Sequence, residues 1–238
     1  YEKIIKAGVF YAKSIEVAET AKAIENAQRD INIAFINEIA LLCQKLDISV
    51  YDVLDAAKTK WNFLPFQPGL VGGHCIGVDP YYLSYIAKKN NFTPKIILSG
   101  RKVNESIPKI IAKKIINKLL VKKDISKVKI LILGLTFKEN CSDVRNSKVF
   151  DLINYLSIKL QKIDVYDPWV KRGSIKSNNK FKMIKSISKN KYDVIVYAVK
   201  HDFFSKIEEK KIISFGKKEP LIVDLKNELS KSYPEIRL

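Results

Sequence analysis

The residues from Gly69 to Pro80 bring a thiol and a carboxylate into one short turn. They read Gly-Leu-Val-Gly-Gly-His-Cys-Ile-Gly-Val-Asp-Pro, with Cys75 among four glycines that let a ligand approach the main chain closely. Asp79 and Pro80 predict a helix start, with Asp79 as the N-cap. A cysteine just before a helix N-terminus lies near the positive end of the dipole, which favours the thiolate. The stretch predicts a nucleophilic thiol or, alternatively, a buried structural cysteine.

The segment from Asn62 to Leu83 resembles the active-site segment of the nucleotide-sugar dehydrogenases. It reads NFLPFQPGLVGGHCIGVDPYYL and is most similar to the bacterial branch that acts on UDP-N-acetylhexosamines for surface polysaccharides. The resemblance implies oxidation of the sugar C6 alcohol to a carboxylate by NAD⁺, through a thioester on Cys75. Four residues of the segment are expected to bind the substrate: Phe63, Leu64, Gly72 and Gly73.

A long helix is predicted from Ile15 to Leu46, because apolar residues recur there at three- and four-residue steps. Lys22, Asn26 and Asp30 lie four residues apart and share one face, which periodicity alone would leave in water. The segment 18–38 also resembles the family's central helix, in which a lysine and an asparagine reach the active site. The resemblance carries these catalytic roles to Lys22 and Asn26.

A third similarity covers GLTFKENCSDVR, from Gly134 to Arg145. In the family, the residues equivalent to Phe137 and Lys138 contact the substrate, and the arginine equivalent to Arg145 approaches the cofactor. A basic loop over a helix N-terminus is the alternative. This turn has one glycine rather than G-x-G-x-x-G, and the glycine-rich loop around Cys75 does not follow a strand. We therefore expect the NAD site to lie outside the chain.

The hydrophobic pattern divides the chain into two predicted domains, residues 1–124 and 125–238. The first is all-helical: a short helix follows Ser49 as its cap, another spans 80–89, and a helical segment spans 93–120, which Pro108 must kink or split. In the family such a helix builds a homodimer interface. The apolar face that suits burial against a partner or the first helix comprises Ile96, Ile97, Ile110, Ile111 and Ile115.

The second predicted domain alternates strands with helices. Apolar runs at 128–134, 162–166, 192–199 and 221–224 predict buried parallel strands, with helices at 147–161 and 203–213. This is a doubly wound, Rossmann-like domain of the α/β class, and its ligand is expected at the carboxyl ends of the strands. The resemblance makes it the UDP-sugar-binding domain, with the N-terminal NAD-binding Rossmann domain absent from this chain.

Composition narrows the function classes. The 238 residues are 47% hydrophobic, no apolar run approaches the ~20 residues that span a bilayer, and no signal peptide is visible. Three cysteines without framework spacing indicate a reducing cytosol, so we expect a cytoplasmic protein without a membrane partner. No cluster has metal-ligand spacing. The chain opens on Tyr1, and its only methionine is Met183, so we expect a piece of a longer protein.

The formal net charge of +18 raises the possibility of nucleic-acid binding. The lysines are scattered, however, and no stripe of them is interleaved with aromatic residues, as it is in single-strand binders. A basic surface of this kind suits an anionic substrate such as a UDP-sugar. We therefore do not expect a nucleic-acid partner.

These motifs together predict an NAD-dependent UDP-N-acetylhexosamine 6-dehydrogenase. Cys75 would attack the C6 aldehyde, while Lys22 and Asn26 would stabilise the negative charge that develops on the C6 oxygen. The resemblance implies that Asp79 positions or deprotonates the hydrolytic water, a role compatible with capping the helix. His74 is not expected to pair with Cys75, because adjacent side chains usually point apart.

Two alternatives remain open. This chain alone would be a catalytically inactive module for nucleotide-sugar binding and dimerisation, or the parent would be a UDP-glucose 6-dehydrogenase. Many UDP-glucose enzymes carry a basic residue before the glycines, where this chain reads Pro65-Phe-Gln-Pro68. An uncharged loop stiffened by proline favours an acetamido sugar, but it does not separate the epimers.

Overall fold

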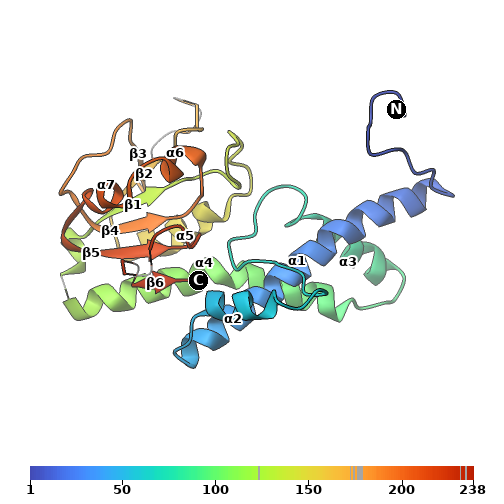
Figure 1. The fold of residues 1–238 in the computed structure, drawn as a ribbon, viewed down its shortest axis with the longest axis horizontal. Helices are drawn as coiled ribbons and strands as arrows, with labels where there is room; N and C mark the ends of the chain where they lie inside the picture. The colour runs from blue at the N-terminus through green and yellow to red at the C-terminus, as the bar shows by residue number, and fades with distance from the viewer. Residues whose placement is uncertain (123, 172, 174, 176–178, 231, 234) are drawn as a thin grey trace.

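A helical part and an α/β part lie side by side and share one long helix, α4 (Figure 1). The computed structural model describes residues 1–122, 124–171, 173, 175, 179–230, 232–233 and 235–238. No helix among these residues combines the length and the apolar character needed to cross a bilayer. The fold class predicted from the sequence is confirmed.

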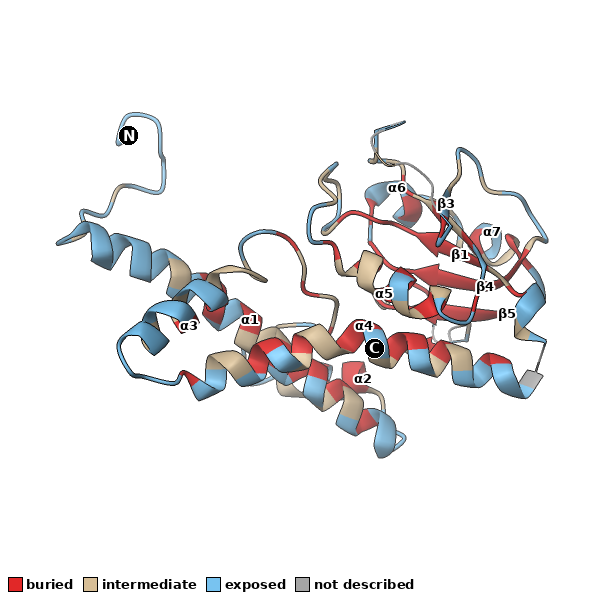
Figure 2. Cartoon of the chain, turned by 180° about the vertical axis from the view of Figure 1, so that it is seen from behind, coloured by how far each residue is buried: buried red, intermediate tan, exposed pale blue. Residues whose placement is uncertain are grey.

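The helical part is organised around α1, which spans Ile15–Lys45 and packs against α3 and α4. It begins after Ser14, whose hydroxyl accepts the N–H of Val17. The first two turns of α1 are exposed (Figure 2). Its buried residues begin at Asn26. The burial of α1 therefore begins at Asn26, whereas the other candidate catalytic residue of this helix, Lys22, lies in its exposed part.

Two shorter helices complete the helical part. Helix α2 spans Val50–Ala57 and begins after Ser49, whose hydroxyl accepts the N–H of Asp52, so the predicted cap is confirmed. Helix α3 spans Asp79–Lys89 and follows the glycine-rich loop. A small apolar cluster joins α1 to α2: Ile36, Ala40, Cys43, Val50, Tyr51 and Leu54.

Helix α4 runs without interruption over Lys95–Lys122. The prediction that Pro108 splits this helix is therefore wrong. Proline removes one backbone hydrogen bond, but Pro108 and its neighbour Ile107 are buried, and packing on both sides stabilises the helix. Ile111 and Ile115 are buried against the α/β part, whereas Ile96 is exposed. Two of the five residues of the predicted dimerisation face of α4 are therefore covered within this chain.

The α/β part is built on a parallel six-stranded sheet in the order β3-β2-β1-β4-β5-β6. The order reverses between β1 and β4, as in doubly wound folds. Strands β3 and β6 are two-residue edge pairings that the hydrophobic pattern does not reveal. The strands span Lys129–Leu133 (β1), Lys162–Tyr166 (β2), Lys182–Met183 (β3), Tyr192–Tyr197 (β4), Gly216–Asp224 (β5) and Ile236–Arg237 (β6).

Both faces of the sheet are covered. Ile130 and Ile132 of β1 face α4 and α5, which spans Lys148–Ser157 and ends earlier than predicted. The alternate residues Leu131 and Leu133 pack in the cluster that contains Phe204 and Ile212. A short 3-10 helix, Ile125–Lys127, precedes β1.

The predicted helix 203–213 is two short helices, α6 (Asp202–Ser205) and α7 (Glu209–Ile213). Phe204 and Ile212 are both buried in the same cluster. In one straight helix, residues eight positions apart point about 80° away from each other. The break lets both side chains reach the sheet.

Candidate active site

Three segments that are distant in the sequence enclose a cavity of about 430 Å³. They are α1, the loop around Cys75, and the loop that follows β1. Most of the predicted site residues line the cavity: Lys22, Asn26, Gly72, Gly73, Cys75, Phe137 and Lys138. Glu25, Arg29 and His74 join them and were not predicted. The cavity therefore places three cationic side chains, from Lys22, Arg29 and Lys138, beside one carboxylate, from Glu25.

Cys75 is exposed in a turn that leads directly into α3. Its carbonyl accepts the N–H groups of Val78 and Asp79, at 3.0 and 2.8 Å. Asp79 is therefore the first residue of α3, and the prediction that it caps the helix is wrong, because Val78 holds the cap position without a side-chain bond. The turn starts early enough to include Asp79, which frees its carboxylate for another partner.

That partner is Asn26 on α1. The Nδ2 atom of Asn26 donates to Oδ2 of Asp79 over 2.5 Å, and Asn26 is 2% exposed. The two residues are 53 positions apart in the sequence, so only the packing of α1 against α3 brings them together. Asn26 therefore points inward, contrary to what periodicity alone would give.

Lys22 and Arg29 lie on the more solvent-exposed side of the cavity. The Lys22 side chain is 61% exposed, and its Nζ lies 3.3 Å from Oε2 of Glu25. Arg29 donates to the other oxygen of Glu25 over 2.5 Å. Exposed pairs of this kind are weak, so a substrate anion can compete for both cations.

The two adjacent glycines allow close contact between the Cys75 loop and the α/β part. A Cβ on Gly72 would lie 2.5 Å from the carbonyl oxygen of Asn146, and one on Gly73 would lie 2.7 Å from the ring of Phe137. Gly73 also has a φ of +84°, and its N–H donates to the Asn146 carbonyl. Larger residues at either position would separate the two loops.

Asp143 anchors the loop that carries Phe137 and Lys138. It accepts hydrogen bonds from Nε and Nη2 of the Arg145 guanidinium, and its Oδ2 lies 2.7 Å from Nε2 of His74. The bonds from Arg145, followed by that from His74, hold the pKa of Asp143 well below its ordinary value. His74 is thus bonded to Asp143, a partner that the sequence did not predict.

Four predicted residues lie outside this cavity's lining: Phe63, Leu64, Arg145 and Asp79, the last of which is joined to the lining by its bond from Asn26. Phe63 is half-buried against the α1–α2 cluster, and Leu64 is exposed. The Arg145 side chain is 73% exposed and bound to Asp143. Their substrate and cofactor roles stay predictions.

Side chains fill the point at which the strand order reverses. Asp167 follows β2, and its Oδ2 accepts the N–H groups of Leu135 and Thr136 at 2.6 and 3.1 Å. The buried His201 follows β4; its Nε2 lies 3.1 Å from the same oxygen, while its Nδ1 accepts the Asn140 N–H over 3.0 Å. These bonds hold the start of the loop that presents Phe137 and Lys138 to the cavity.

This arrangement does not fit a dinucleotide at the β1 turn. A pyrophosphate there needs free backbone N–H groups, and those of Leu135 and Thr136 are bonded to the carboxylate of Asp167. Burial favours the neutral acid, yet the bonds from His201 and from the Leu135 backbone hold the pKa of Asp167 below its ordinary value. The turn therefore presents a negative charge where a dinucleotide would bring two more.

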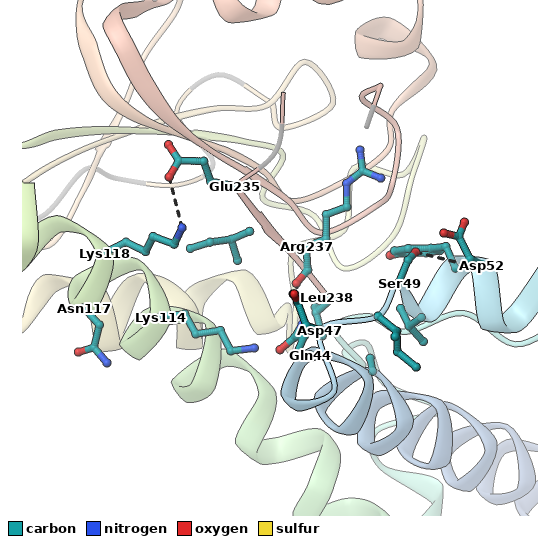
Figure 3. Close-up of a pocket in the computed structure, with 15 residues that line it drawn as sticks. Gln44, Asp47, Ser49, Asp52, Lys114, Asn117, Lys118, Glu235, Arg237 and Leu238 are labelled. Atoms are coloured by element: carbon teal, nitrogen blue, oxygen red, sulfur yellow. Dashed lines mark hydrogen bonds and ion pairs between the residues drawn. The ribbon is translucent and has the colours of Figure 1, made fainter. Parts of the chain in front are cut away.

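A wider cleft of about 700 Å³ lies elsewhere, between the end of α1, α2, α4 and β6 (Figure 3). Figure 3 shows an ion pair between Lys118 and Glu235 at one side of it and the Ser49 cap at the other. None of the predicted catalytic or binding residues lines it. Within the described ranges, no three His, Cys, Asp or Glu side chains are grouped so that they could hold a metal ion.

Sequence reasoning missed several charged residues around the site. Glu25 and Arg29, one turn apart on α1, could have been found from their spacing. The pairing of Asp30 on α1 with Arg101 on α4, over 2.6 Å, spans 71 residues and leaves no local signal. Within α4, Arg101 also donates to Glu105.

Comparison with known proteins supports the assignment of these two parts. Residues 16–106 match the central domain, and residues 131–231 match the UDP binding domain, of the UDP-glucose/GDP-mannose dehydrogenase family. The chain belongs to this family. The similarity inferred from the Cys75 segment, the first helix and the Gly134–Arg145 loop is thereby confirmed.

Individual relatives cover nearly all of the chain. The UDP-N-acetyl-D-glucosamine 6-dehydrogenase of Salmonella typhi is 43% identical over 240 residues, which is 100% of this chain and 56% of that protein. The UDP-N-acetyl-D-mannosamine dehydrogenase of Campylobacter jejuni is 37% identical over 90% of this chain and 52% of its own length. The structure of UDP-D-ManNAc dehydrogenase from Pyrococcus horikoshii has a TM-score of 0.79 at 28% identity, covering 98% of this chain and 53% of that one. The chain spans about half the length of these relatives.

Proposed function

We propose that the protein containing this chain oxidises the C6 alcohol of a UDP-N-acetylhexosamine to the uronic acid, in an NAD-dependent four-electron reaction through a thioester on Cys75. The observation that carries the proposal is the cavity in which Cys75 lies with Lys22, Asn26 and Lys138. A thiol, a hydrogen-bond donor and cationic side chains converge there from three distant segments. Acyl chemistry on a phosphorylated sugar needs all three.

Cys75 is the nucleophile in this proposal. Its thiolate adds to the C6 aldehyde, and the S–C bond that forms leaves negative charge on the C6 oxygen. Lys22 supplies a cation for that oxygen. Asn26 supplies a hydrogen bond, because an amide has two N–H donors and only one is given to Asp79.

Asp79 is the water-activating group. One carboxylate oxygen accepts the Asn26 bond, which leaves the other to accept a proton from water as that water attacks the thioester carbonyl. The attack breaks the S–C bond, the thiolate leaves, and the uronic acid is released. The Asn26 bond keeps the Asp79 carboxylate beside the turn that carries Cys75.

NAD⁺ is the hydride acceptor that the family implies, and it would supply the oxidising equivalents when bound. The β1 turn of this chain does not fit its pyrophosphate, because Asp167 occupies the backbone donors. We therefore assign the main NAD site to a part of the protein outside residues 1–238. Arg145, exposed at the edge of the site, is the residue of this chain that we assign to the cofactor.

The cationic lining supports a UDP-sugar as substrate. Lys22, Arg29 and Lys138 face one cavity, where a diphosphate gains from several positive charges. Phe137 presents an aromatic ring in the same lining, and Lys138 Nζ lies 5.5 Å from the centre of that ring. Phe63 and Leu64 complete the proposed substrate contacts by similarity alone.

The N-acetylglucosamine epimer has the better support. The relative named for the gluco epimer is 43% identical and covers the whole chain, against 37% over 90% for the relative named for the manno epimer. UDP-glucose is the alternative substrate. The proposed setting is cytoplasmic synthesis of a bacterial surface polysaccharide such as a capsule or O-antigen.

A homodimer through the central helices is part of the proposal. Exposed apolar side chains recur two or three turns apart along α1: Val17, Ile24, Phe35 and Leu42. A stripe of this kind is typical of a helix that packs against another chain. Light scattering on the Phe35→Glu variant should show monomers if this face forms the interface. An unchanged dimer would place the interface elsewhere.

The decisive test is Cys75→Ser in the full-length protein, because a hydroxyl is a much poorer nucleophile at neutral pH. We expect uronic acid formation from UDP-N-acetylglucosamine and NAD⁺ to be abolished or severely slowed. Cys43→Ala is the matched control, since Cys43 is a buried thiol in the α1–α2 cluster. Undiminished product from Cys75→Ser would refute the covalent mechanism.

A further inference from the structure

Behind the candidate active site, α4 carries a buried arginine to which neither sequence similarity nor the proposed reaction assigns a role. Arg101 is 2% exposed, and its Nη1 lies 2.6 Å from Oδ1 of Asp30 on α1. Its guanidinium carbon lies 5.5 Å from the centre of the Tyr81 ring on α3. One side chain therefore joins α4 to both α1 and α3.

The two contacts flank the hydrogen bond between Asn26 and Asp79. Asp30 lies one turn after Asn26 on α1, and Tyr81 lies two residues after Asp79 on α3. Arg101 thus holds the two helices together where they exchange that 2.5 Å bond. Because the Asp79 N–H donates to the Cys75 carbonyl, a displacement of the start of α3 also displaces the thiol.

Asn104, one turn along α4, holds the beginning of the same loop. Its Nδ2 donates to Oδ1 of Asp30 over 2.8 Å, and its Oδ1 accepts from Asn37 over 2.9 Å. Asn37 in turn bonds both the N–H and the carbonyl of Gly69, at 2.8 and 3.0 Å. The loop that carries Cys75 is therefore anchored to one network at both ends.

Glu105 extends the network into the α/β part. It accepts from Arg101 on one side and from Lys148 on the other, the latter over 2.6 Å. Lys148 is the first residue of α5, two positions after Asn146, whose carbonyl accepts the Gly73 N–H. A chain of charges thus runs behind the loop from α1 to the domain that the family similarity assigns to UDP binding.

Stability alone does not account for this arrangement. A buried ion pair loses much of its attraction to desolvation, and well-packed apolar residues often serve the fold as well or better. Two buried atoms of the pair, Asp30 Oδ2 and Arg101 Nε, have no hydrogen-bond partner among the described residues. The pair therefore has a desolvation cost for the fold, and a role in positioning would explain why these two residues are present.

We propose that Arg101 is a positioning residue for the reaction, which fixes the Asn26–Asp79 bond through its contacts with Asp30 and Tyr81. The inference rests on the proposed function and deepens it. The step that it governs is thioester hydrolysis, because Asp79 must point its second oxygen at the water that attacks the carbonyl. When the Asp79 carboxylate is displaced, Cys75 is acylated faster than the thioester is hydrolysed, so the acylated enzyme accumulates.

The test uses the full-length protein and a double variant, Asp30→Asn with Arg101→Met. This variant removes both charges together, so neither remains buried without a counter-charge, and asparagine keeps the acceptor for Asn104. Tyr81→Ala is the second variant; Tyr81 is 47% exposed, so its loss does not threaten the core. Lys118→Met is the control, since it removes a cation from the same helix outside the cavity.

For each variant, steady-state turnover, KM for UDP-N-acetylglucosamine and the fraction of enzyme that carries a covalent sugar adduct are measured, the last by intact mass after acid quenching. We expect kcat to fall by up to about 10²-fold in the double variant, as small misplacements near a reacting centre do. KM should change little and the adduct fraction should rise. Tyr81→Ala should move kcat and the adduct fraction in the same directions, and Lys118→Met should match the wild type.

Wild-type kcat and adduct fraction in Tyr81→Ala, or in a folded double variant, would overturn the positioning role. A fall in kcat without a rise in adduct would do the same, since it would place the defect before acylation. Failure of the wild-type protein itself to form uronic acid or adduct would instead overturn the proposed function, and the inference with it, before any variant is compared.

Discussion

The amide nitrogen of Asn26 lies 2.5 Å from Oδ2 of Asp79, and this bond connects the central helix to the first residue of α3. It explains why an asparagine is buried on α1 and why an aspartate at a helix start does not cap that helix. It also separates the two carboxylate oxygens of Asp79 by function. One is fixed by Asn26, and the other remains for water.

Replacing Asp79 by asparagine tests that division. The amide oxygen can still accept from Asn26, but the side chain can no longer take a proton, so hydrolysis should slow by about 10²- to 10⁴-fold. We expect a burst of reduced cofactor followed by accumulation of a covalent adduct, measured by rapid quench and intact mass. A slow first turnover without adduct would show that Asp79 serves an earlier step.

Lys22→Ala should separate catalysis from stability. The Lys22 side chain is 61% exposed and forms only a surface pair with Glu25, so the melting temperature should stay unchanged. Turnover should fall by roughly 10²- to 10³-fold, the usual effect of removing one donor to a developing oxyanion. Lys45→Ala, on an exposed lysine in the last turn of the same helix, should leave turnover intact. Equal rates for the two variants would show that Lys22 only faces solvent and has no catalytic role.

Gly72→Ala should weaken the contact between the Cys75 loop and the α/β part. The new Cβ would lie 2.5 Å from a backbone oxygen, which cannot move aside as a flexible side chain would. We expect a loss of about 1–3 kcal/mol in the free energy of unfolding, the usual range for overpacking. Gly69→Ala is the control, because a Cβ there meets nothing within 4 Å. The measurement is urea denaturation of both variants, and similar midpoints would show that the loop can adjust.

Much of this architecture can be predicted from sequence, because its signals are local. The β2 strand over Lys162–Tyr166 and the Ser49 cap follow from neighbouring residues, and both are confirmed. The burial of Asn26 was available only through family similarity, since periodicity would leave it in water. The partner it bonds, 53 positions away, depends on how α1 packs against α3.

The errors have a common physical origin. The prediction that Pro108 splits α4 is wrong, because tertiary packing compensates for the lost backbone bond, while the predicted kink stays a prediction. Two contacts were missed. Asp30 and Arg101 are 71 residues apart, and Asp167 lies about 30 residues from the β1 turn whose N–H groups it accepts. No local pattern encodes such pairs.

Asp167 should contribute to stability above acidic pH. Its folded pKa is lower than the unfolded value of about 3.9, so the carboxylate form stabilises the fold at neutral pH. As pH falls through about 4 toward the folded pKa, the unfolded chain binds a proton first and stability is lost. Asp167→Asn should therefore show a shallower loss of the free energy of unfolding over this range, measured by urea denaturation from pH 6 to about pH 3. Parallel curves for the two proteins would contradict the assignment.

The last prediction concerns residues 1–238 as an isolated chain. Its β1 turn has no free donors for a pyrophosphate, because Leu135 and Thr136 both donate to Asp167, so NAD⁺ should not bind measurably. UDP-N-acetylglucosamine should bind weakly through the cationic lining of the cavity, and more weakly as salt rises, since exposed charges are screened. The net charge of +18 should not confer tight binding to duplex DNA, because its lysines are scattered.

Calorimetry at two salt concentrations, with each of the three ligands in turn, separates these outcomes. Strong NAD⁺ binding would show that the NAD site lies within residues 1–238 and not outside them. Strong, salt-sensitive duplex binding without a UDP-sugar signal would overturn the enzyme proposal for this chain. Weak UDP-sugar binding that Lys138→Ala abolishes and Lys45→Ala preserves would locate the nucleotide at the Phe137–Lys138 loop, because only Lys138 of these two lysines lines the cavity.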